Sequence, residues 1–385
     1  MARILEFSID GLAGRAEPYS AELKPDVNVF FGLNGSGKTT LLKILHSALS
    51  TDVEILKGLP FAGARVKVYL NRYEAEFWRV FERSEPNLTM DSSWETLNET
   101  AFMSHSARTA HSEKIGRWRS DPPESEEERL THYKEGFLPI SRLYRNIKTS
   151  TGTRLLSDRE LDSAFERSLS AQWSVYYAEI SNQIAKAQER GFAEILNFFL
   201  SGDSEREVEQ SVPNADAAYE LIHGFFERQP QFAHLLHNKK EFTSQYESRP
   251  ELRDVVKRVE SVEKDIDSIV APRERFRTTL ESMFSGGKHL EFSEKEIRIR
   301  LSENQEIGLV SLSSGEKQLV VMALSVLTGG NHCLIVDEPE LSMHVDWQKK
   351  LVSVMRNLNP KIQLIMATHS PEIMADISDE NIFRI

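Results

Sequence analysis

Apolar and polar residues alternate through the first part of the chain, in the pattern of strands that bury one face. A single helical segment, from about Lys38 to Ser50, interrupts this alternation. The alternating segments are RILEFSI, YSAEL, VNVFF, ARVKVYL and YEAEFWRVF. They predict a sheet-rich half-domain that contains one helix.

In the middle third of the chain the apolar residues recur every three or four positions, which is the period of a helix. The pattern runs from about Ser157 to Met283 and consists of Leu161, Phe165, Leu169, Trp173, Tyr176, Ile180 and Ile184, then Leu252, Val255, Val259, Val262, Ile266 and Ile269 before Pro272. We expect a helical insertion with room for a helical hairpin. Its aromatic residues should mainly form a core, and the excess leaves room for a surface on which a partner docks.

A stretch without clear periodicity, about residues 87–136, precedes the insertion. Its segment SDPPESEEER carries five carboxylates and two prolines. Such a composition cannot bury enough apolar surface to become ordered, so it predicts a mobile surface loop.

After Gly287 the strand pattern returns in HLEFS, EIRIRLS and EIGLVSL. CLIVDE then reads as a buried strand and IQLIMATH as the next one. Between them lies a helix whose buried face consists of Gln348, Leu351, Val352, Met355 and Leu358. This strand, helix, strand order predicts a parallel α/β unit.

The composition, with 40% apolar and 28% charged residues in 385, fits a globular chain of two domains or of one domain with insertions. The single cysteine, Cys333, excludes an intramolecular disulfide. No apolar run reaches the ~18 residues of a membrane span, and the N-terminus alternates where a secretory signal would be continuous. We therefore expect a cytoplasmic protein without a membrane partner.

The net charge of -12 argues against indiscriminate binding to polyanions. Two basic stretches could nevertheless contact nucleic-acid phosphates, with Trp118 stacked on a base. They are SRLYRNIKTSTGTR, with Arg142, Arg145, Lys148 and Arg154, and SARTAHSEKIGRWR, with Arg108, Lys114, Arg117 and Arg119. The alternative is that both are solvated faces of an acidic chain. Asp265 and Asp267 are interpreted in the same way, as part of an exposed helix face.

The segment GLNGSGKTT, residues 32–40, satisfies the pattern G-x-x-x-x-G-K-[ST] between a predicted strand and a predicted helix. In such a loop the backbone N–H groups and the helix N-terminus bind phosphates, the lysine neutralises the β and γ phosphates, and the Thr39 hydroxyl ligates Mg²⁺. The alternative is a glycine turn without a ligand. We expect ATP to contact Asn34, Gly35, Ser36, Gly37, Lys38, Thr39 and Thr40.

The far end of the chain supplies acids that phosphoryl transfer requires. CLIVDEPE ends a buried strand in Asp337 and Glu338. Asp337 can hold the magnesium ion through water, and Glu338 can polarise an attacking water. In ATHSP, Ser370 and Pro371 suit the start of a helix, which leaves His369 at the strand end beside the phosphates.

LSSGEKQ has two compatible interpretations. Ser313 and Glu316 form a capping box for the helix that ends at Gly329 and Gly330. A helix N-terminus preceded by Ser-Ser-Gly is also a good anion site.

Taken in order, GLNGSGKTT, LSSGEKQL, LIVDEPE and ATHSP resemble the Walker A, signature, Walker B and switch histidine of the ATP-binding-cassette ATPase superfamily. The stretch between Lys38 and Ser313 is far longer than in transporter cassettes. LSSGEKQ and DEPELSMH…WQ…ATHSPEI look like the branch with RecF, SMC and the OLD-like ATPases of bacterial anti-phage systems such as Septu, PARIS and certain retrons.

This resemblance implies an α/β fold of the P-loop NTPase type: an ABC-ATPase head with an N-terminal antiparallel β subdomain and a large helical insertion. The two halves of the head would be residues 1–155 and 286–385, around an insertion at 156–285. It also implies a homodimer, or a higher even oligomer, around two ATP molecules with Mg²⁺. Glu338 would be the general base, His369 would contact the γ-phosphate, and the partner's nucleotide would meet Ser313, Ser314, Gly315 and Glu316.

The pattern departs from the family in two places. No glutamine occurs between Thr40 and Ala171, so the Q-loop glutamine is missing and Arg142 occupies a plausible equivalent. The aspartate of the D-loop, counted from Asp337, falls on His344.

The resemblance favours a Mg-dependent ATPase that controls a separate effector, a nuclease or toxin, in anti-phage defence. The sequence after His369 is too short for the Toprim nuclease of OLD enzymes, so we expect no nuclease site in this chain. One alternative is a DNA repair or chromosome ATPase like RecF or SMC. Another is a regulatory module that holds ATP with little turnover.

Overall fold

The computed structural model describes residues 2–70, 74–83, 115–121, 136–139, 158–201, 214–227, 238–284, 286–302, 305–330 and 333–385. The chain forms two compact units. The first unit combines Met1–Trp173 with Arg275–Ile385, and the second unit is Ser174–Glu274. The expected loop near 87–136 falls mostly outside the described residues. The domain boundaries expected from the sequence remain a proposal.

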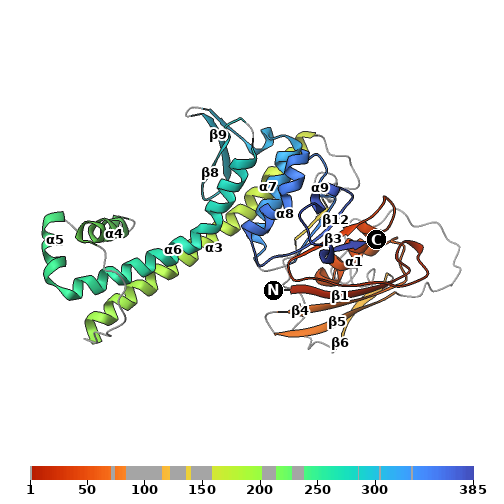
Figure 1. The fold of residues 1–385 in the computed structure, drawn as a ribbon, viewed down its shortest axis with the longest axis horizontal. Coiled ribbons are helices and arrows are strands. Elements are labelled where there is room, and N and C mark those ends of the chain that lie inside the picture. Colours follow the sequence, from red (N-terminus) through yellow and green to blue (C-terminus); the bar gives the residue numbers. More distant parts are fainter. Residues whose placement is uncertain are drawn as a thin grey trace, which may run out of the picture. The chain divides into compact units, whose positions relative to one another are not determined.

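The first unit contains a five-stranded antiparallel sheet built mainly from the N-terminal segments (Figure 1). In spatial order its strands are β2 (Tyr19–Glu22), β1 (Ala2–Asp10), β4 (Gly63–Leu70), β5 (Ala75–Glu82) and β6 (Arg117–Asp121). Alternation sets the faces: in β4, for example, Ala64, Val66 and Val68 are buried while Arg65 is exposed. The predicted N-terminal strands are present, and β6 is an additional strand that the alternation did not indicate. The expected strand EIGLVSL is wrong in its second half, because the chain is extended only to Ile307 and forms a 3-10 helix over Leu309–Ser311.

Strand β6 corrects the interpretation of Trp118. The indole packs against Phe81, with ring centroids 5.2 Å apart, and its Nε1 donates a hydrogen bond to Ser47 Oγ at 2.9 Å. Its neighbour Arg119 pairs with Glu82 at 2.9 Å. The half-buried ring therefore takes part in the packing between this sheet and the helix that carries Ser47, which favours a structural role for Trp118 over stacking on a nucleic-acid base.

A second, parallel sheet positions the candidate site. In spatial order its strands are β13 (Ile382–Arg384), β3 (Val27–Phe31), β12 (Gln363–Thr368), β11 (Cys333–Asp337) and β7 (Gly136–Pro139). Every residue of β11 and β12 is buried, as expected for parallel strands covered on both faces. Because all neighbours run parallel, β3, β12 and β11 end at the same edge of the sheet.

Helices of the first unit pack around these strands. They are α1 (Lys38–Ser50), α7 (Ser314–Thr328), α8 (Val345–Leu358) and the short α9 (Pro371–Met374). Helix α1 shares one apolar core with both sheets, in which Leu41, Leu45 and Ile365 are fully buried. Helix α7 is buried from Leu319 to Leu327, so it forms part of the interior.

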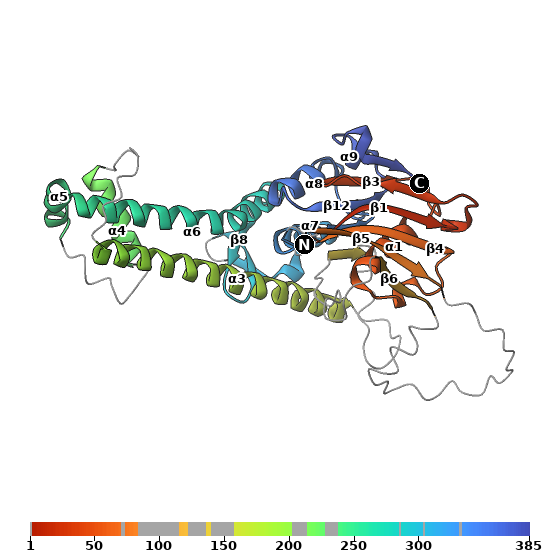
Figure 2. The same cartoon turned by 90° about the horizontal axis from the view of Figure 1, so that it is seen from below.

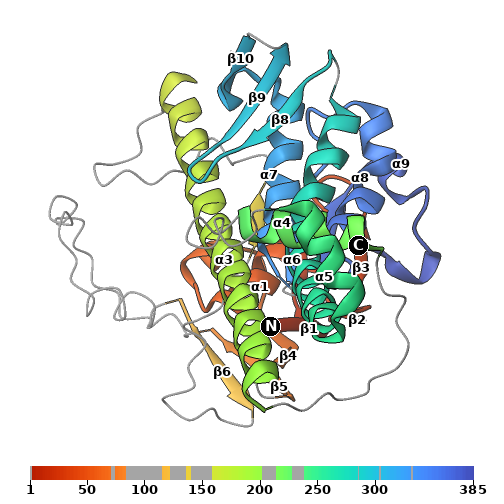
Figure 3. The ribbon, with the colours of Figure 1, turned by 90° about the vertical axis from the view of Figure 1, so that its left-hand side faces the viewer.

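A three-stranded antiparallel sheet completes the first unit (Figure 3). It consists of β8 (His289–Phe292), β9 (Ile297–Ser302) and β10 (Gln305–Ile307). The fully buried Trp173 stacks on Phe292 at a centroid distance of 4.7 Å, and its Nε1 donates to Ser293 O at 2.7 Å. These contacts anchor the first part of α3 (Asp158–Ser201) to this small sheet.

The second unit is helical. It holds α4 (Ala215–Glu227), α5 (Lys239–Ser248) and the adjoining stretches of α3 and α6 (Pro250–Met283). Within this unit α3 and α6 lie side by side (Figure 2). Gly191 approaches Val262 so closely that a Cβ would not fit. Asp265 and Asp267 are exposed, and α6 continues through Pro272.

The predicted α/β class, with its N-terminal antiparallel sheet and its helical insertion, is confirmed by this architecture. Within the described ranges, no helix combines the length and the apolar character needed to cross a membrane.

Candidate nucleotide-binding site

The loop between β3 and α1 leaves a helix N-terminus open. Gly35 and Gly37 adopt left-handed backbone conformations, with φ of 84° and 103°, which glycine tolerates best. Gly37 is the N-cap of α1, and no side chain caps this helix end. The N–H groups of the first turn, which begins at Lys38, have no acceptor within the helix itself. They are therefore available to an anion.

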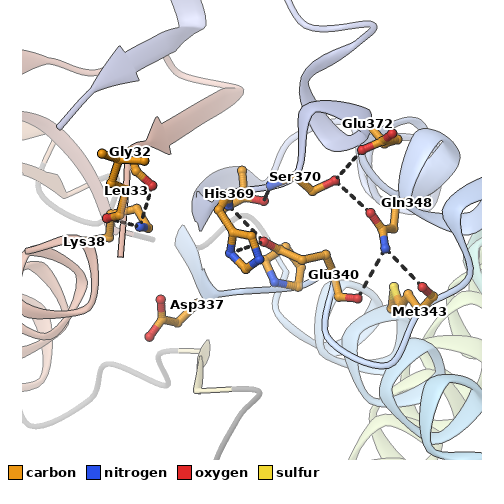
Figure 4. A network of polar contacts seen from close by, with 12 residues as sticks. Gly32, Leu33, Lys38, Asp337, Glu340, Met343, Gln348, His369, Ser370 and Glu372 are labelled. Carbon is orange, nitrogen blue, oxygen red and sulfur yellow. Dashed lines mark hydrogen bonds and ion pairs between the residues drawn. The ribbon is translucent and has the colours of Figure 1, made fainter. Parts of the chain in front are cut away.

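The Lys38 side chain is held across the same loop. Its Nζ donates to Gly32 O at 2.8 Å and to Leu33 O at 2.9 Å, although only 5% of the residue is exposed (Figure 4). Both acceptors are neutral carbonyl oxygens. Neither of them offsets the charge of a lysine ammonium, whereas a phosphate group would.

Asp337 faces α1 from the end of β11. Thr39 Oγ1 donates to Asp337 Oδ2 at 2.9 Å, and within the described part of the chain the buried Oδ1 has no hydrogen-bond partner. Burial raises the pKa of Asp337, Glu338 raises it further, and Thr39, Lys43 and Lys38 oppose the shift. Carboxylate and hydroxyl oxygens are the donors that Mg²⁺ prefers, and the orphaned oxygen lacks a partner that such a cation would supply. Asp337 and Thr39 therefore fit the ion.

Glu338 turns out of the strand into a cavity. Its backbone has a φ of 51°, a left-handed conformation that is rare for a residue with a side chain, and its N–H donates to Ala367 O at 2.8 Å. The cavity has a volume of about 250 Å³. It is lined by Ala13, Asn34, Gly35, Gly37, Lys38, Thr39, Thr40, Pro60 and Glu338.

The cavity thus brings together six of the seven loop residues expected to contact ATP, and Glu338 from the far end of the chain. The remaining one, Ser36, lies in the same loop outside the lining, with a buried Oγ. Sequence reasoning missed Ala13 and Pro60, which come from two turns joined by a hydrogen bond from Ala13 N to Pro60 O at 2.9 Å. Neither turn carries a recognisable motif.

His369 follows β12, the strand that lies between β3 and β11. Its backbone N–H donates to Glu340 Oε1 at 2.9 Å, and its Nδ1 lies 3.0 Å from the same oxygen (Figure 4). The imidazole is 47% exposed, whereas the Glu340 side chain is 5% exposed. Sequence reasoning missed Glu340; the only signal was the third acid of DEPE.

Gln348 of α8 ties the turn after β11 to the turn after β12. Its Nε2 donates to Met343 O at 3.0 Å and to Glu340 O at 3.4 Å, while its Oε1 accepts from Ser370 Oγ at 2.7 Å (Figure 4). The sequence identified Gln348 only as part of a helix face. The side chain in fact holds Glu340, which contacts His369, and Ser370, which follows His369 in the chain.

The signature segment forms the predicted capping box at the start of α7. Ser313 Oγ is positioned to accept from Glu316 N, and Glu316 Oε2 accepts from Ser313 N at 2.9 Å. Burial opposes ionisation of Glu316, but Lys288, at 2.5 Å from its Oε1, and Ser313 outweigh that effect and lower its pKa. Ser313 and Ser314 are exposed, whereas Gly315 and Glu316 are buried. None of the four lines the cavity in this chain.

Two further contacts join α7 to the segment after β11. The buried Gln318 donates from Nε2 to Pro339 O at 2.8 Å. Gly315 lies against Ser342 O, where a Cβ would not fit. His344, at the expected D-loop position, caps α8 by accepting from Asp346 N through Nδ1.

Strand β7 runs parallel to β11 and ends at Pro139 on the edge that carries the site. Arg142, the suggested equivalent of the missing glutamine, lies outside the described residues.

A phosphate loop of this geometry, facing acids from β11 across one sheet edge, puts the chain in the class of P-loop nucleotide-binding domains. Within that class it belongs to the AAA ATPase domain family, whose profile matches residues 15–374.

Comparison with curated proteins finds shorter matches. The chain is 28% identical over 95 residues to the "Retron Vc95 probable ATPase" of Vibrio cholerae serotype O1 biovar El Tor. This match covers 21% of this chain and 18% of that protein. It is 27% identical over 93 residues to the "Retron Ec83 probable ATPase" of Escherichia coli, covering 21% and 17%. The chain therefore matches less than a fifth of the length of either relative.

Among solved structures, the SMC head domain of Pyrococcus furiosus with an extended coiled coil, bound to the C-terminal domain of ScpA, aligns with 100% of this chain and 93% of its own. The TM-score is 0.44 and the sequence identity 12%.

Proposed function

We propose that the chain binds Mg-ATP in the cavity at the end of β3 and hydrolyses it. The observation that carries this proposal is the buried, unpartnered Oδ1 of Asp337 beside Thr39 and the open N-terminus of α1. An anion with its cation would satisfy all of these groups together. Membership of an ATPase family supports the same ligand.

In this proposal each residue has one task. The first turn of α1 and Lys38 bind the β and γ phosphates. Thr39 and Asp337 hold Mg²⁺, which supplies charge neutralisation when bound. Glu338 accepts a proton from the attacking water at its carboxylate, and His369 contacts the γ-phosphate.

Replacement of Glu338 by glutamine tests the hydrolytic step. The variant Glu338→Gln should bind ATP with unchanged affinity and lose on the order of 10²-fold or more in turnover, because the amide cannot accept the proton. Calorimetric titration and steady-state phosphate release measure the two properties separately. Normal turnover in this variant would remove Glu338 from the role of base.

We further propose that two copies close around two ATP molecules, with Ser313, Ser314, Gly315 and Glu316 facing the nucleotide of the partner. The cavity volume of about 250 Å³ is below the ~300–1,000 Å³ of typical ligand pockets, so a single chain encloses only part of a nucleotide. The exposed Ser313 and Ser314 are accessible to a second copy.

The variant Ser313→Arg separates ATP binding from dimerisation. Its bulky cation should block the closed dimer while leaving ATP binding by one chain intact. Light scattering with and without Mg-ATP measures the mass, and Glu338→Gln, which should trap ATP, serves as the positive control. An ATP-dependent dimer of Ser313→Arg would contradict the arrangement.

We propose that ATP binding or hydrolysis controls a separate effector in anti-phage defence, in the cytoplasm. The support is the similarity to two retron ATPases, which covers only a short segment of each. Affinity capture of the tagged chain from its native extract, with and without ATP, and mass identification of bound proteins provides the test. A nuclease or toxin retained in one nucleotide state would support the proposal, and its absence in every state would count against it.

A further inference from the structure

Glu340 is a buried acid whose place in the fold is not explained by the turn that contains it. It lies three residues after β11 with 6% exposure. Backbone bonds close this turn without its carboxylate, from Leu341 N to Glu338 O at 3.3 Å and from Met343 N to Glu340 O at 3.0 Å. The carboxylate must therefore have another reason to be there.

The contacts of this carboxylate point to His369. Oε1 accepts from the backbone N–H of His369 at 2.9 Å and lies 3.0 Å from its Nδ1, while the buried Oε2 has no hydrogen-bond partner among the described residues. Removing a carboxylate from water is strongly unfavourable unless it is paired. A buried acid with only one oxygen in use is thus a poor choice for stability alone.

The geometry determines which ring nitrogen is free. Nδ1 faces the acid, and the two nitrogens of an imidazole point to different sides, so Nε2 faces away from Glu340. A carboxylate that accepts from one ring N–H fixes both the tautomer and the orientation of a histidine. Because β12 lies between β3 and β11, the ring so fixed stands at the sheet edge that carries the phosphate loop.

We propose that Glu340 is a positioning residue for ATP hydrolysis: it holds the proton of His369 on Nδ1 and presents Nε2 to the γ-phosphate. This inference rests on the proposed function, in which His369 contacts that phosphate. A ring that donates from both nitrogens is a cation, and the carboxylate of Glu340 supplies the opposite charge beside it.

Gln348 of α8 also holds Glu340 and the residue after His369 in place. It binds the carbonyl of Glu340 at 3.4 Å and the hydroxyl of Ser370 at 2.7 Å. The acid and the residue after His369 are therefore fixed to the same side chain of α8.

The test compares Glu340→Gln with His369→Gln and with the double variant. Glu340→Gln keeps the shape but removes the charge, so kcat should fall about 10-fold or more while KM for ATP changes less than about 2-fold. His369→Gln should lose at least as much, and the double variant should lose no more than His369→Gln alone. Glu372→Gln is the matched control, because it removes a neighbouring charge that contacts Ser370 and not the ring.

A second readout does not depend on activity. Imidazole ¹⁵N spectra of the nucleotide-free protein, assigned by the signal lost in His369→Gln, should show Nδ1 protonated in the native chain and a changed tautomer ratio in Glu340→Gln. Glu340→Asp, which keeps the charge, should restore part of both properties and serves if the amide variant is unstable.

The outcomes are distinct. Native kcat and an unchanged ring spectrum in Glu340→Gln would overturn the positioning role. If His369→Gln hydrolyses ATP normally, the proposed function of His369 fails, whatever the spectrum of Glu340→Gln shows about the ring.

Discussion

Two helices of the first unit begin in opposite ways. Helix α1 starts at Gly37, with no side chain to cap it. Helix α7 starts at Ser313 with a complete capping box, in which Glu316 is held in turn by Lys288. Both helix ends could bind an anion on the basis of their sequences, yet in the folded chain a side chain caps only the second, where Ser313 Oγ accepts from Glu316 N.

If two copies close around ATP as proposed, the difference implies an order of events. The open end of α1 requires no rearrangement to receive a phosphate, so one chain should bind nucleotide before it meets a second copy. At α7 the Ser313 hydroxyl already donates to Glu316 Oε2 at 2.9 Å. That bond must be exchanged for one to a phosphate if α7 is to cover the nucleotide of a partner.

Lys38→Ala alters the uncapped N-terminus of α1, and its effect on ATP affinity should be the largest of the expected effects. Loss of the ammonium removes the charge that neutralises the phosphates, so ATP affinity should fall at least about 100-fold, or about 2.7 kcal/mol. Calorimetric titration measures this, with Lys349→Ala on the exposed side of α8 as control. An affinity within a few-fold of native would show that the open end of α1 is not the phosphate site.

Lys288→Ala alters the capped N-terminus of α7, and we expect it to change stability and not ATP affinity. The pair with Glu316 is 18% and 5% exposed, so removing the lysine leaves a buried carboxylate short of a partner and should lower the free energy of unfolding by about 2 kcal/mol. ATP affinity of the single chain should not change. Urea unfolding provides the measurement.

The matched control for that variant is Lys24→Ala. Lys24 pairs with Glu380 at 3.1 Å, but both side chains are largely exposed. Its loss should cost less than about 1 kcal/mol. Equal losses in the two variants would mean that the capping box does not depend on Lys288.

The smallest expected effect is a loss of stability at acid pH that is caused by His46 of α1. Burial lowers the pKa of His46 to about 4, from 6.5, against the opposing charge of Asp52. The unfolded chain then takes up this proton more readily, so stability present above pH 6.5 is lost as the pH falls towards 4. Between pH 7 and pH 5.5 the loss should be about 1 kcal/mol.

His46→Gln should remove that part of the pH dependence. Urea unfolding of both proteins at several pH values gives the comparison. The two curves should run parallel above pH 7 and differ in slope below it, and a His46→Gln curve as steep as the native one would assign the acid sensitivity to other groups.

The first half of the site could be predicted from sequence because it is local. The phosphate loop, α1 and the capping box of α7 each depend on residues within one turn or one helix, so their motifs carry the geometry. The pairing of Thr39 with Asp337 was also accessible, because both residues belong to motifs with a shared ligand.

The remainder depends on which segments meet in space. Glu340 contacts His369 only because β12 brings the histidine beside it, and Ala13 lines the cavity only because its turn bonds to Pro60. Strand β7 has four residues and shows no alternation, so its pairing with β11 determines its conformation. Strand β6 alternates arginines with Trp118, which resembles a basic patch until Phe81 and Ser47 are known to cover the ring.

The position of β3 also bears on how the protein is made. Both neighbours of β3, which are β12 and β13, come from residues 363–384. A ribosome releases the phosphate loop long before it releases these strands, so β3 has no partner strand on either edge until residues 363–384 have been made. Until those residues emerge, both edges of β3 present unpaired backbone groups of the kind that favour aggregation.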